Sequence, residues 1–381
     1  MKKIYDLLIL GGGVSGCVLA YSLITDGYKG KIAIIENGRK LGGRFSSRKS
    51  LKNKGWILNH GSPNFNILNT DKNQLMNEFL NKLLKNNLII SDDSDVLEIN
   101  NNLETSFSNE NDFYKGNVYR PKSSMTNLLK NLIDNVQMLN KIELIYSTLI
   151  TEFDFANNIW NISSGEEEFQ TKFIISASNL ILHKRSIQIL KKGDIPLRNA
   201  IPEGKNKKID KIITLVNNMD SLKRVNYLIY PNNLYKYKKS YFKNNIHFLF
   251  NYEAEKKFGL ERIVFQKQIS QNVGIVIHTR DLNYNDSFEY NIISNNILIK
   301  KFNYIFQDSN LVNKLENFKD ISIMRWRASQ PKGDGVPSEL QICEEYKIAF
   351  CGDWFDFPGF SRVEGAIISA LSLSSKINKY L

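Results

Sequence analysis

The chain has 381 residues, of which 42% are hydrophobic, so it is long enough for two domains with substantial cores. Its net charge of +12 comes from lysines spread through an Asn-, Ile- and Lys-rich sequence. It lacks a basic block interleaved with aromatic residues, the pattern that favours nucleic-acid binding. We therefore expect no nucleic-acid partner, and the lack of a long uncharged apolar stretch predicts no membrane span.

The sequence contains three cysteines and four histidines, at Cys17, Cys343, Cys351, His60, His183, His247 and His278. The cysteines are odd in number and lie in apolar segments, which predicts reduced core residues and a cytoplasmic protein. The histidines show no spacing typical of metal ligands, so no metal site is predicted.

The first predicted element is an apolar strand over residues 4–10 that leads into Gly11-x-Gly13-x-x-Gly16 and then into a helix. In a dinucleotide site, Gly11 permits the tight turn, Gly13 leaves room for a pyrophosphate and Gly16 lets the helix pack close to the strand. The first helical residues, Val14 and Ser15, offer free backbone amides to the phosphates.

A second predicted strand, residues 31–35, ends at Glu36, which follows Gly16 by 20 residues. At this spacing a carboxylate accepts hydrogen bonds from a ribose. The next motif, Gly42-Gly43-Arg44, points to FAD, because glycines let a loop pass close to a cofactor and a guanidinium can bind phosphate or flavin oxygens. The alternative is a solvated basic turn.

The middle of the chain predicts helices over residues 71–85 and 124–134, the second capped by Ser123 or Ser124. A hairpin over residues 152–161 turns at Asn157-Asn158, and residues 173–177 form a buried strand that returns to the nucleotide domain. Alternating segments then predict a separate antiparallel sheet, with strands over residues 212–216, 227–230, 246–250, 262–268 and 273–279.

Near the C-terminus, a buried strand over residues 347–351 runs into Gly352-Asp353, and a helix begins around Val363-Glu364-Gly365-Ala366. Asp353 could accept a hydrogen bond from a hydroxyl of the cofactor. Amides at the helix N-terminus could face the pyrimidine edge of a flavin, where negative charge collects on reduction. The alternative is a plain core helix.

The segment Met324-Arg325-Trp326-Arg327-Ala328 reads as a strand with both arginines on one face. Either the arginines pair at the surface, or one of them binds an anionic or carboxamide-bearing substrate. Catalytic residues are not fixed by the sequence. The candidates to line a flavin cavity are His60, Arg327 and Trp354, each of which could equally be structural.

Together these blocks resemble the FAD-linked amine oxidase superfamily and, within it, the renalase-like oxidoreductases. The likeness rests on Gly11 to Gly16 with Glu36, Gly42 to Arg44, residues 59–65, residues 324–328, and residues 352–354 with 362–366. The chain departs from the family pattern at Gly38, where many relatives carry arginine, and at Asn59, where aspartate is common.

The resemblance implies an α/β fold in which a Rossmann-like FAD-binding domain of the GxGxxG type is joined to a mostly antiparallel-sheet substrate domain. We expect the first domain to comprise residues 1–68, 118–180 and 321–381, and the second residues 69–117 and 181–320. FAD would be held non-covalently by Gly11, Gly13, Val14, Ser15, Gly16, Glu36, Gly43, Arg44, Gly352, Asp353, Val363, Glu364, Gly365 and Ala366.

The implied activity is an FAD-dependent oxidoreductase that transfers hydride from a small-molecule donor to flavin N5. The donor suggested by the resemblance is a dihydro isomer of NAD(P)H, with O2 as the electron acceptor and H2O2 as the product. One alternative is a flavin amine oxidase, although no lysine can be assigned the role that such enzymes give to one. A second is a non-catalytic carrier on the same fold.

Overall fold

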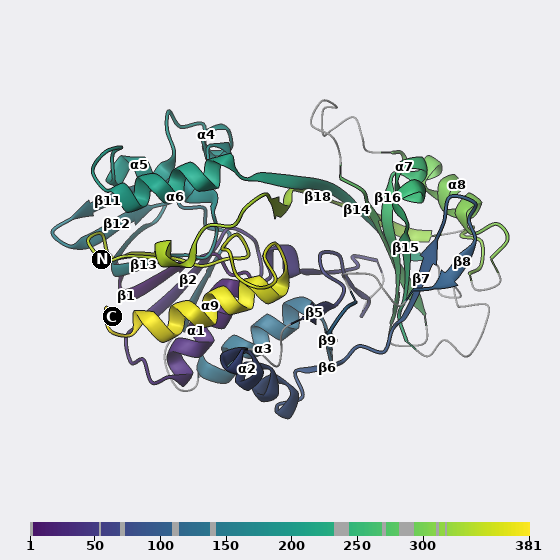
Figure 1. Cartoon of the computed structure of the whole chain (residues 1–381), viewed down its shortest axis with the longest axis horizontal. Coiled ribbons are helices and arrows are strands. Elements are labelled where there is room, and N and C mark those ends of the chain that lie inside the picture. The colour runs from purple at the N-terminus through teal and green to yellow at the C-terminus, as the bar shows by residue number, and fades with distance from the viewer. Residues whose placement is uncertain are drawn as a thin grey trace.

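The computed structural model describes residues 3–52, 55–68, 73–108, 114–137, 142–231, 244–268, 272–281, 293–309, 312–316 and 318–381. Two halves, each built around its own sheet, lie side by side along the long axis (Figure 1). We call them the parallel half and the antiparallel half. Two long paired strands, β14 (Asp220–Pro231) and β18 (Phe318–Lys332), extend from the antiparallel half toward the parallel half.

The parallel half is built on parallel strands in the order β10-β2-β1-β13-β20, and a hairpin and a short strand extend it in the antiparallel sense. The parallel strands are β10 (Ile142–Tyr146), β2 (Ile32–Glu36), β1 (Lys3–Leu10), β13 (Glu168–Ser176) and β20 (Ile348–Phe350). The antiparallel additions are β11 (Glu152–Ala156), β12 (Ile159–Ser163) and β19 (Ile342–Cys343).

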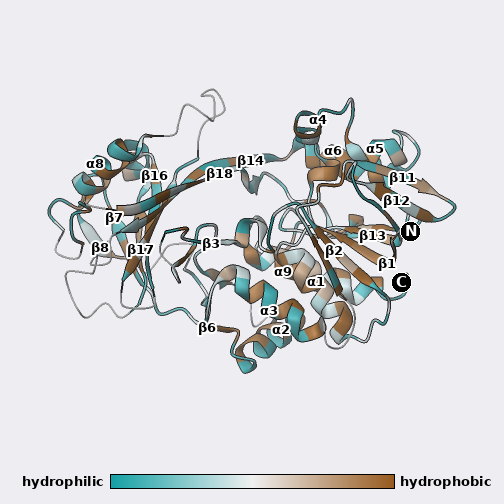
Figure 2. Cartoon of the chain, turned by 180° about the vertical axis from the view of Figure 1, so that it is seen from behind, coloured by the Kyte–Doolittle hydropathy of each residue, from teal (hydrophilic) through white to brown (hydrophobic). Residues whose placement is uncertain are grey.

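Helices cover both faces of this sheet, as buried parallel strands require. In β1, Leu7 and Ile9 face one core while Leu8 and Leu10 face the other. Figure 2 shows these strands as brown, apolar ribbons between the helical layers. The first layer contains α1 (Val14–Thr25), α2 (Gln74–Lys85), α3 (Met125–Gln137) and α9 (Val363–Ile377), and the second contains α4 (Arg185–Leu190), α5 (Pro196–Ala200) and α6 (Lys207–Asn218).

The antiparallel half is a sheet in the order β18-β14-β17-β16-β15-β7-β8, with only the β15–β7 pair parallel. Two helices, α7 and α8, pack on one face through a phenylalanine-rich core. The other face meets β4 through a small cluster around Leu58 and Val276. The remaining elements are β17 (Val273–Thr279), β16 (Leu260–Lys267), β15 (Ile246–Phe250), β7 (Asp95–Ile99), β8 (Thr105–Phe107), α7 (Tyr252–Phe258) and α8 (Asn295–Ile305).

Short strands form two further small sheets, apart from the sheets of the parallel and antiparallel halves. One pairs β3 (Ser47–Lys49) with β4 (Ile57–Asn59), and the other joins β5 (Phe65–Ile67), β9 (Asn117–Pro121) and β6 (Ile89–Ser91). Both chain ends lie in the parallel half (Figure 1), where α1 and α9 share one core. This arrangement brings the glycine-rich loop and the C-terminal helix together.

The structure confirms the predicted α/β class and the mostly antiparallel second sheet. It also confirms the hairpin, because Asn157 and Asn158 both have positive φ between β11 and β12. The strand predicted over residues 212–216 is wrong. The segment belongs to α6, whose buried residues, Ile209, Ile212, Ile213 and Val216, have helical spacing, and Asn206 caps it through hydrogen bonds from the next amides.

Elements within a single predicted domain segment pack in different halves of the structure. Within residues 69–117, α2 packs with α1 and α9 in the parallel half, and only β7 and β8 join the second sheet. Within residues 181–320, α5 and α6 cover the other face of the parallel sheet. Within residues 321–381, most of β18 belongs to the antiparallel sheet. Amphipathic helices bury their apolar face on the nearest available sheet, whichever strand follows them in sequence.

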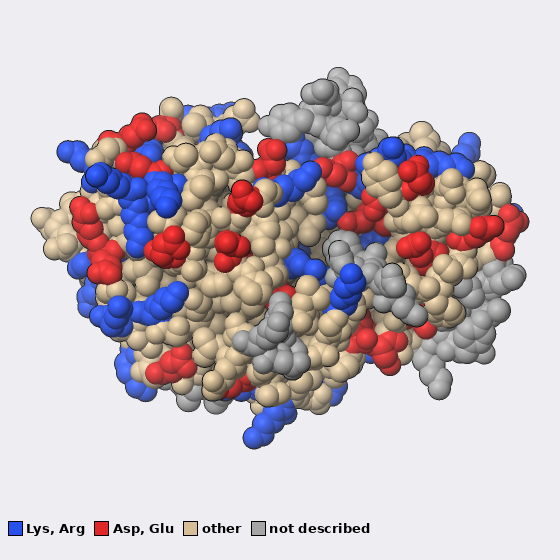
Figure 3. All heavy atoms as spheres, in the orientation of Figure 1, with Lys and Arg blue, Asp and Glu red and all other residues tan. Residues whose placement is uncertain are grey.

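Basic and acidic side chains are interspersed over the face shown in Figure 3. The three cysteines are buried and free, as predicted for reduced core residues. Within the described part of the chain, none of the helices combines the length and apolar character needed to cross a bilayer.

Candidate functional site

A cavity of about 480 Å³ lies where the carboxyl ends of the parallel strands face the antiparallel sheet. Open α/β sheets bind ligands at this edge, because the loops that follow the strands converge there. The lining at this edge comes from Leu10 at the end of β1, Glu36 at the end of β2 with Asn37 after it, Thr148 to Ile150 after β10, Ser176 at the end of β13 with residues 177–179 after it, and Gly352 and Asp353 after β20.

The glycine-rich loop presents bare backbone to the cavity. A Cβ on Gly13 would have no protein atom within 4 Å, so open space lies directly in front of it. A Cβ on Gly16 would overlap the carbonyl oxygen of Gly11, which explains why α1 can pack so close to β1 only with glycine there. Gly13 is also the N-cap of α1 and offers no side chain to the first amides, which stay available to an anion.

The carboxylate of Glu36 lies beside this loop at the end of β2. It accepts a hydrogen bond from the N–H of Gly12 at 2.8 Å and another from the N–H of Gly38 at 2.6 Å. Each carboxylate oxygen has a further lone pair, so the two backbone bonds orient Glu36 while leaving it able to accept bonds from a diol. Gly38, the departure from the family pattern, therefore contributes its amide.

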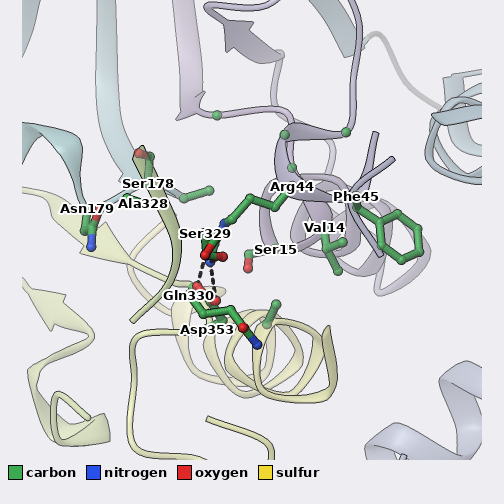
Figure 4. Close-up of a pocket in the computed structure, with 18 of the residues that line it drawn as sticks. Val14, Ser15, Arg44, Phe45, Ser178, Asn179, Ala328, Ser329, Gln330 and Asp353 are labelled. Carbon is green, nitrogen blue, oxygen red and sulfur yellow. Dashed lines mark hydrogen bonds and ion pairs between the residues drawn. The ribbon is translucent and has the colours of Figure 1, made fainter. Parts of the chain in front are cut away.

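Arg44 and Asp353 form a bidentate ion pair across the cavity, with N–O distances of 2.6 and 2.7 Å (Figure 4). Arg44 also donates to the carbonyl of Ser329 at 3.1 Å. Burial acts to lower the pKa of Arg44, but the charge and hydrogen bonds of Asp353 outweigh it and raise that pKa. The pair links the loop after β2 to the loop after β20, which lie 309 positions apart.

Arg185, on α4, is a second cation at this end of the cavity. Its guanidinium donates to the side-chain oxygen of Asn179 at 2.6 Å. Burial, followed by repulsion from Arg44, lowers its pKa to about 10. A buried guanidinium that stays positive in this way favours an anionic ligand nearby.

The N-terminus of α9 contributes Val363 and Ala366 to the lining. Glu364 points elsewhere: its side chain is fully buried, and it accepts a hydrogen bond from the N–H of Leu68 at 3.0 Å. Gly365 is outside the lining too, and a Cβ there would overlap the carbonyl oxygen of Gly359. These two residues therefore hold the helix in place and do not face the cavity.

The antiparallel sheet forms the opposite wall of the cavity through Arg224, Asn226, Arg262, His278 and Trp326. These residues come from β14, β16, β17 and β18. Sequence reasoning missed most of them, together with Arg185. Sheet pairing brings them together, and no local motif marks them. The residues after β13 could have been found, because that strand was already predicted to return to the nucleotide domain.

The three catalytic candidates have different positions. Trp354 lines the cavity and packs on Phe355 at a ring distance of 4.3 Å. His60 lies behind the lining, stacked on Trp326 at 5.6 Å, and burial followed by the charge of Arg48 lowers its pKa to about 4. Arg327 is exposed and outside the lining, because Trp326 takes the cavity face of β18.

Of the residues predicted to hold the cofactor, only Gly16, Glu364 and Gly365 lie outside the lining, while the others contribute to it. None of the three cysteines lines the cavity, and neither does any lysine of the described chain. Among the described residues, no group of His, Cys, Asp and Glu side chains could hold a metal ion.

The glycine loop, Glu36 and most of α2 fall within residues 9–83, which match the model of the NAD(P)-binding Rossmann-like domain family. No curated protein sequence matches the chain significantly. Solved structures match it over nearly its whole length at low identity, which shows the fold alone.

Three of these structures illustrate the range. An oxidoreductase from Methanosarcina mazei has a TM-score of 0.65 at 11% identity, covering 99% of this chain and 100% of that chain. Cyclohexylamine oxidase from Brevibacterium oxydans IH-35A has a TM-score of 0.64 at 10% identity, covering 98% and 99%. The fatty acid isomerase from P. acnes that produces CLA has a TM-score of 0.63 at 8% identity, covering 98% and 99%.

Proposed function

We propose that the chain is an FAD-dependent oxidoreductase whose cofactor binds non-covalently in this cavity. The observation that carries the proposal is one continuous lining that joins the bare glycine loop, Glu36, the Arg44–Asp353 pair and the start of α9. Its volume of about 480 Å³ lies in the range of cofactor sites. The whole-length likeness to an oxidoreductase and to an amine oxidase supports an enzyme of this kind.

The residues present fit such a cofactor. The open space in front of Gly13 would admit a pyrophosphate, and the free amides at the start of α1 would bind it. Glu36 would accept the ribose hydroxyls, and Asp353 would accept a hydroxyl further along the cofactor. Arg44 and Arg185 would balance the phosphate charge. Cysteine linkage is disfavoured because no cysteine reaches the cavity.

When bound, FAD supplies a hydride acceptor, and the protein must orient the donor and exclude water. The antiparallel wall is suited to that task, since its polar side chains are buried and fixed by strand pairing. His60 and His278 are held neutral by burial, which lowers the pKa of both. Neither is placed as a strong base, and a dihydropyridine donor needs none because its ring nitrogen already expels hydride.

Our leading substrate is a dihydro isomer of NAD(P)H, with O2 as acceptor and H2O2 as product. The phosphates of such a donor suit a lining in which arginines outnumber carboxylates. The free buried cysteines support the cytoplasmic location that this substrate would need. Amine oxidation is the second candidate, supported by the fold likeness to cyclohexylamine oxidase.

An anaerobic bleaching experiment tests the proposal. The purified protein is reconstituted with FAD, its visible spectrum is recorded, and NAD(P)H isomers or a panel of amines are added without oxygen. Fast bleaching by the isomers is the expected result, whereas fast bleaching by amines identifies the second candidate. A chain that stays colourless after reconstitution would overturn the flavin assignment and leave a non-catalytic carrier.

A further inference from the structure

The antiparallel wall of the cavity is an ordered row of polar side chains. Pairing of β17 with β14 sets His278 opposite Asn226, and pairing with β16 sets it opposite Arg262. Arg224 pairs with Trp326 one step along the same face. All five residues line the cavity, and Asn226, Arg262 and His278 are each less than a tenth exposed. This is a built surface and not a chance cluster of exposed side chains.

Two β-bulges shape the wall. One lies between Leu260 and Arg262 on β16, where Glu261 is the extra residue, and the other lies between Trp326 and Gln330 on β18, where three residues face Lys223 of β14. A bulge re-aims side chains that regular alternation would send to the opposite face. As a result, Glu261 contacts both arginines of the wall.

Both arginines of the wall contact one carboxylate. Glu261 receives a hydrogen bond from Arg224 at 2.6 Å and lies 3.8 Å from the Nε of Arg262. Arg224 also donates to the neutral side chain of Gln330 at 2.6 Å. Burial, followed by the charges of both arginines, keeps the pKa of His278 well below its ordinary value, so this ring adds no charge. On this wall the two guanidinium groups therefore line the cavity, while Glu261 lies outside the lining.

Several polar atoms of the wall also lack a hydrogen-bond partner among the residues that the structure describes. They are Oδ1 of Asn226, Nε2 of His278, Nε1 of Trp326 and Nε of Arg224. Buried polar atoms are almost always paired, so a group of unpaired ones along one cavity wall indicates a ligand that satisfies them. Such a ligand must accept hydrogen bonds from Trp326 and Arg224, as an anion does, and present a donor to Asn226.

We propose that this wall binds the carboxylate or phosphate of an anionic substrate, which Arg224 and Arg262 recognise together. The inference rests on the proposed function, because it assigns a substrate class to the same cavity. A cationic amine would meet two guanidinium groups and one shared carboxylate, which disfavours binding. The wall therefore selects against the second candidate function and accepts organic acids and phosphate esters.

The test uses four matched probes on the FAD-loaded protein: benzoate, phenyl phosphate, benzamide and benzylamine. Binding is followed by the shift of the flavin absorption band. At least one anion should bind about tenfold or more tightly than neutral benzamide, and benzylamine should bind worst. The two anions distinguish a carboxylate site from a phosphate site. Equal or tighter binding of benzylamine would overturn the proposal.

Two substitutions should move anion affinity in opposite directions. Arg224→Met should weaken the preferred anion about tenfold or more, since one charge-assisted contact is lost. Glu261→Gln should strengthen it several-fold, because the negative charge beside both guanidinium groups is then removed. Arg325→Met, on the exposed face of β18, removes the same charge outside the cavity and should change neither value. Unchanged affinity in both wall variants would count against the assignment, provided that their melting temperatures show a folded protein.

Failure of the two proposals can be told apart. Calorimetric titration of the flavin-free protein with the same probes reports the wall without the cofactor. If the chain takes up no FAD but still prefers an anion, the proposed function is overturned and the anion site stands. If the chain binds FAD normally but shows no anion preference by either method, the cofactor assignment stands and the anionic substrate class is overturned.

Discussion

The two sides of the cavity differ in the atoms they present. At the edge of the parallel sheet, the glycine-rich loop presents backbone amides and bare glycines beside the side chains of Glu36, Arg44 and Asp353. On the antiparallel wall, side chains from neighbouring strands line the cavity. We therefore expect the edge of the parallel sheet to be sensitive to any added side-chain atom, and the antiparallel wall to be sensitive to a change of charge or protonation.

The largest effect is expected from an added methyl group at the backbone side. Gly16→Ala should lower the free energy of unfolding by about 3 kcal/mol, because the Cβ would overlap the Gly11 carbonyl oxygen. The control is Gly13→Ala, where the Cβ enters open space and stability should stay within about 0.5 kcal/mol. Gly13→Ala should nevertheless weaken FAD binding. Urea denaturation measures stability and FAD titration measures cofactor binding. Equal stability of the two variants would contradict the difference expected between Gly16 and Gly13.

Protonation should act on the side-chain wall through His60, which lies behind the lining and stacks on Trp326. Burial, followed by Arg48, lowers the pKa of His60 to about 4, below the unfolded value near 6.5. Between these values the unfolded chain binds the extra proton, so stability falls as the pH drops from about 6.5 toward 4. From pH 7 to pH 5, His60 should account for about 2 kcal/mol of the loss. His60→Gln should flatten the curve of unfolding free energy against pH, and parallel curves would contradict this account.

A smaller loss of stability is expected from breaking the Arg44–Asp353 pair, which links the loops after β2 and β20. Asp353→Asn should destabilise the flavin-free protein by about 1.5 kcal/mol, because Arg44 loses a charged partner but stays partly exposed to the cavity. Glu152→Gln is the control, since its pair with Lys192 is exposed to solvent and should contribute little to stability. Thermal melts compare the two. A loss no greater than that of the control would show that the pair contributes little.

The smallest effect is expected at Arg327. Arg327→Ala should leave both stability and probe binding unchanged, within about 0.5 kcal/mol, because this side chain is exposed and faces away from the cavity. Its neighbour Trp326 lines the cavity, so Trp326→Leu should alter the flavin spectrum or the affinity for the probes. If Arg327→Ala changed binding as much as Trp326→Leu, the assigned faces of β18 would be inverted.

The same contrast explains how much could be predicted. The backbone side depends on short-range patterns, such as the spacing of Gly11, Gly13 and Gly16 and the distance to Glu36, which a sequence displays directly. The wall depends on which strands pair and where they bulge. Nothing near Arg262 in the sequence indicates that Asn226 and His278 lie in its row.

One local prediction was wrong and one pairing was not predicted, both for physical reasons. In α6 the apolar residues Ile212 and Ile213 are β-branched and suggested a strand, but a wider window shows the helical period and the Asn206 cap. Arg44 and Asp353 were each predicted to contact the cofactor, and neither pattern indicated that they would bond to each other. Pairings between distant segments depend on the folded topology.

The regular pairing of β18 with β14 between Ile321 and Trp326 has a consequence for insertions and deletions. At the end of this stretch Trp326 lines the cavity, while Arg325 and Arg327 on either side of it are exposed. Removing one residue from the start of β18 would move each following side chain to the opposite face of the strand and turn Arg325 and Arg327 toward the cavity. Removing two residues would preserve the alternation. Homologous chains should therefore tolerate length changes in this strand only in even steps, or with a compensating bulge.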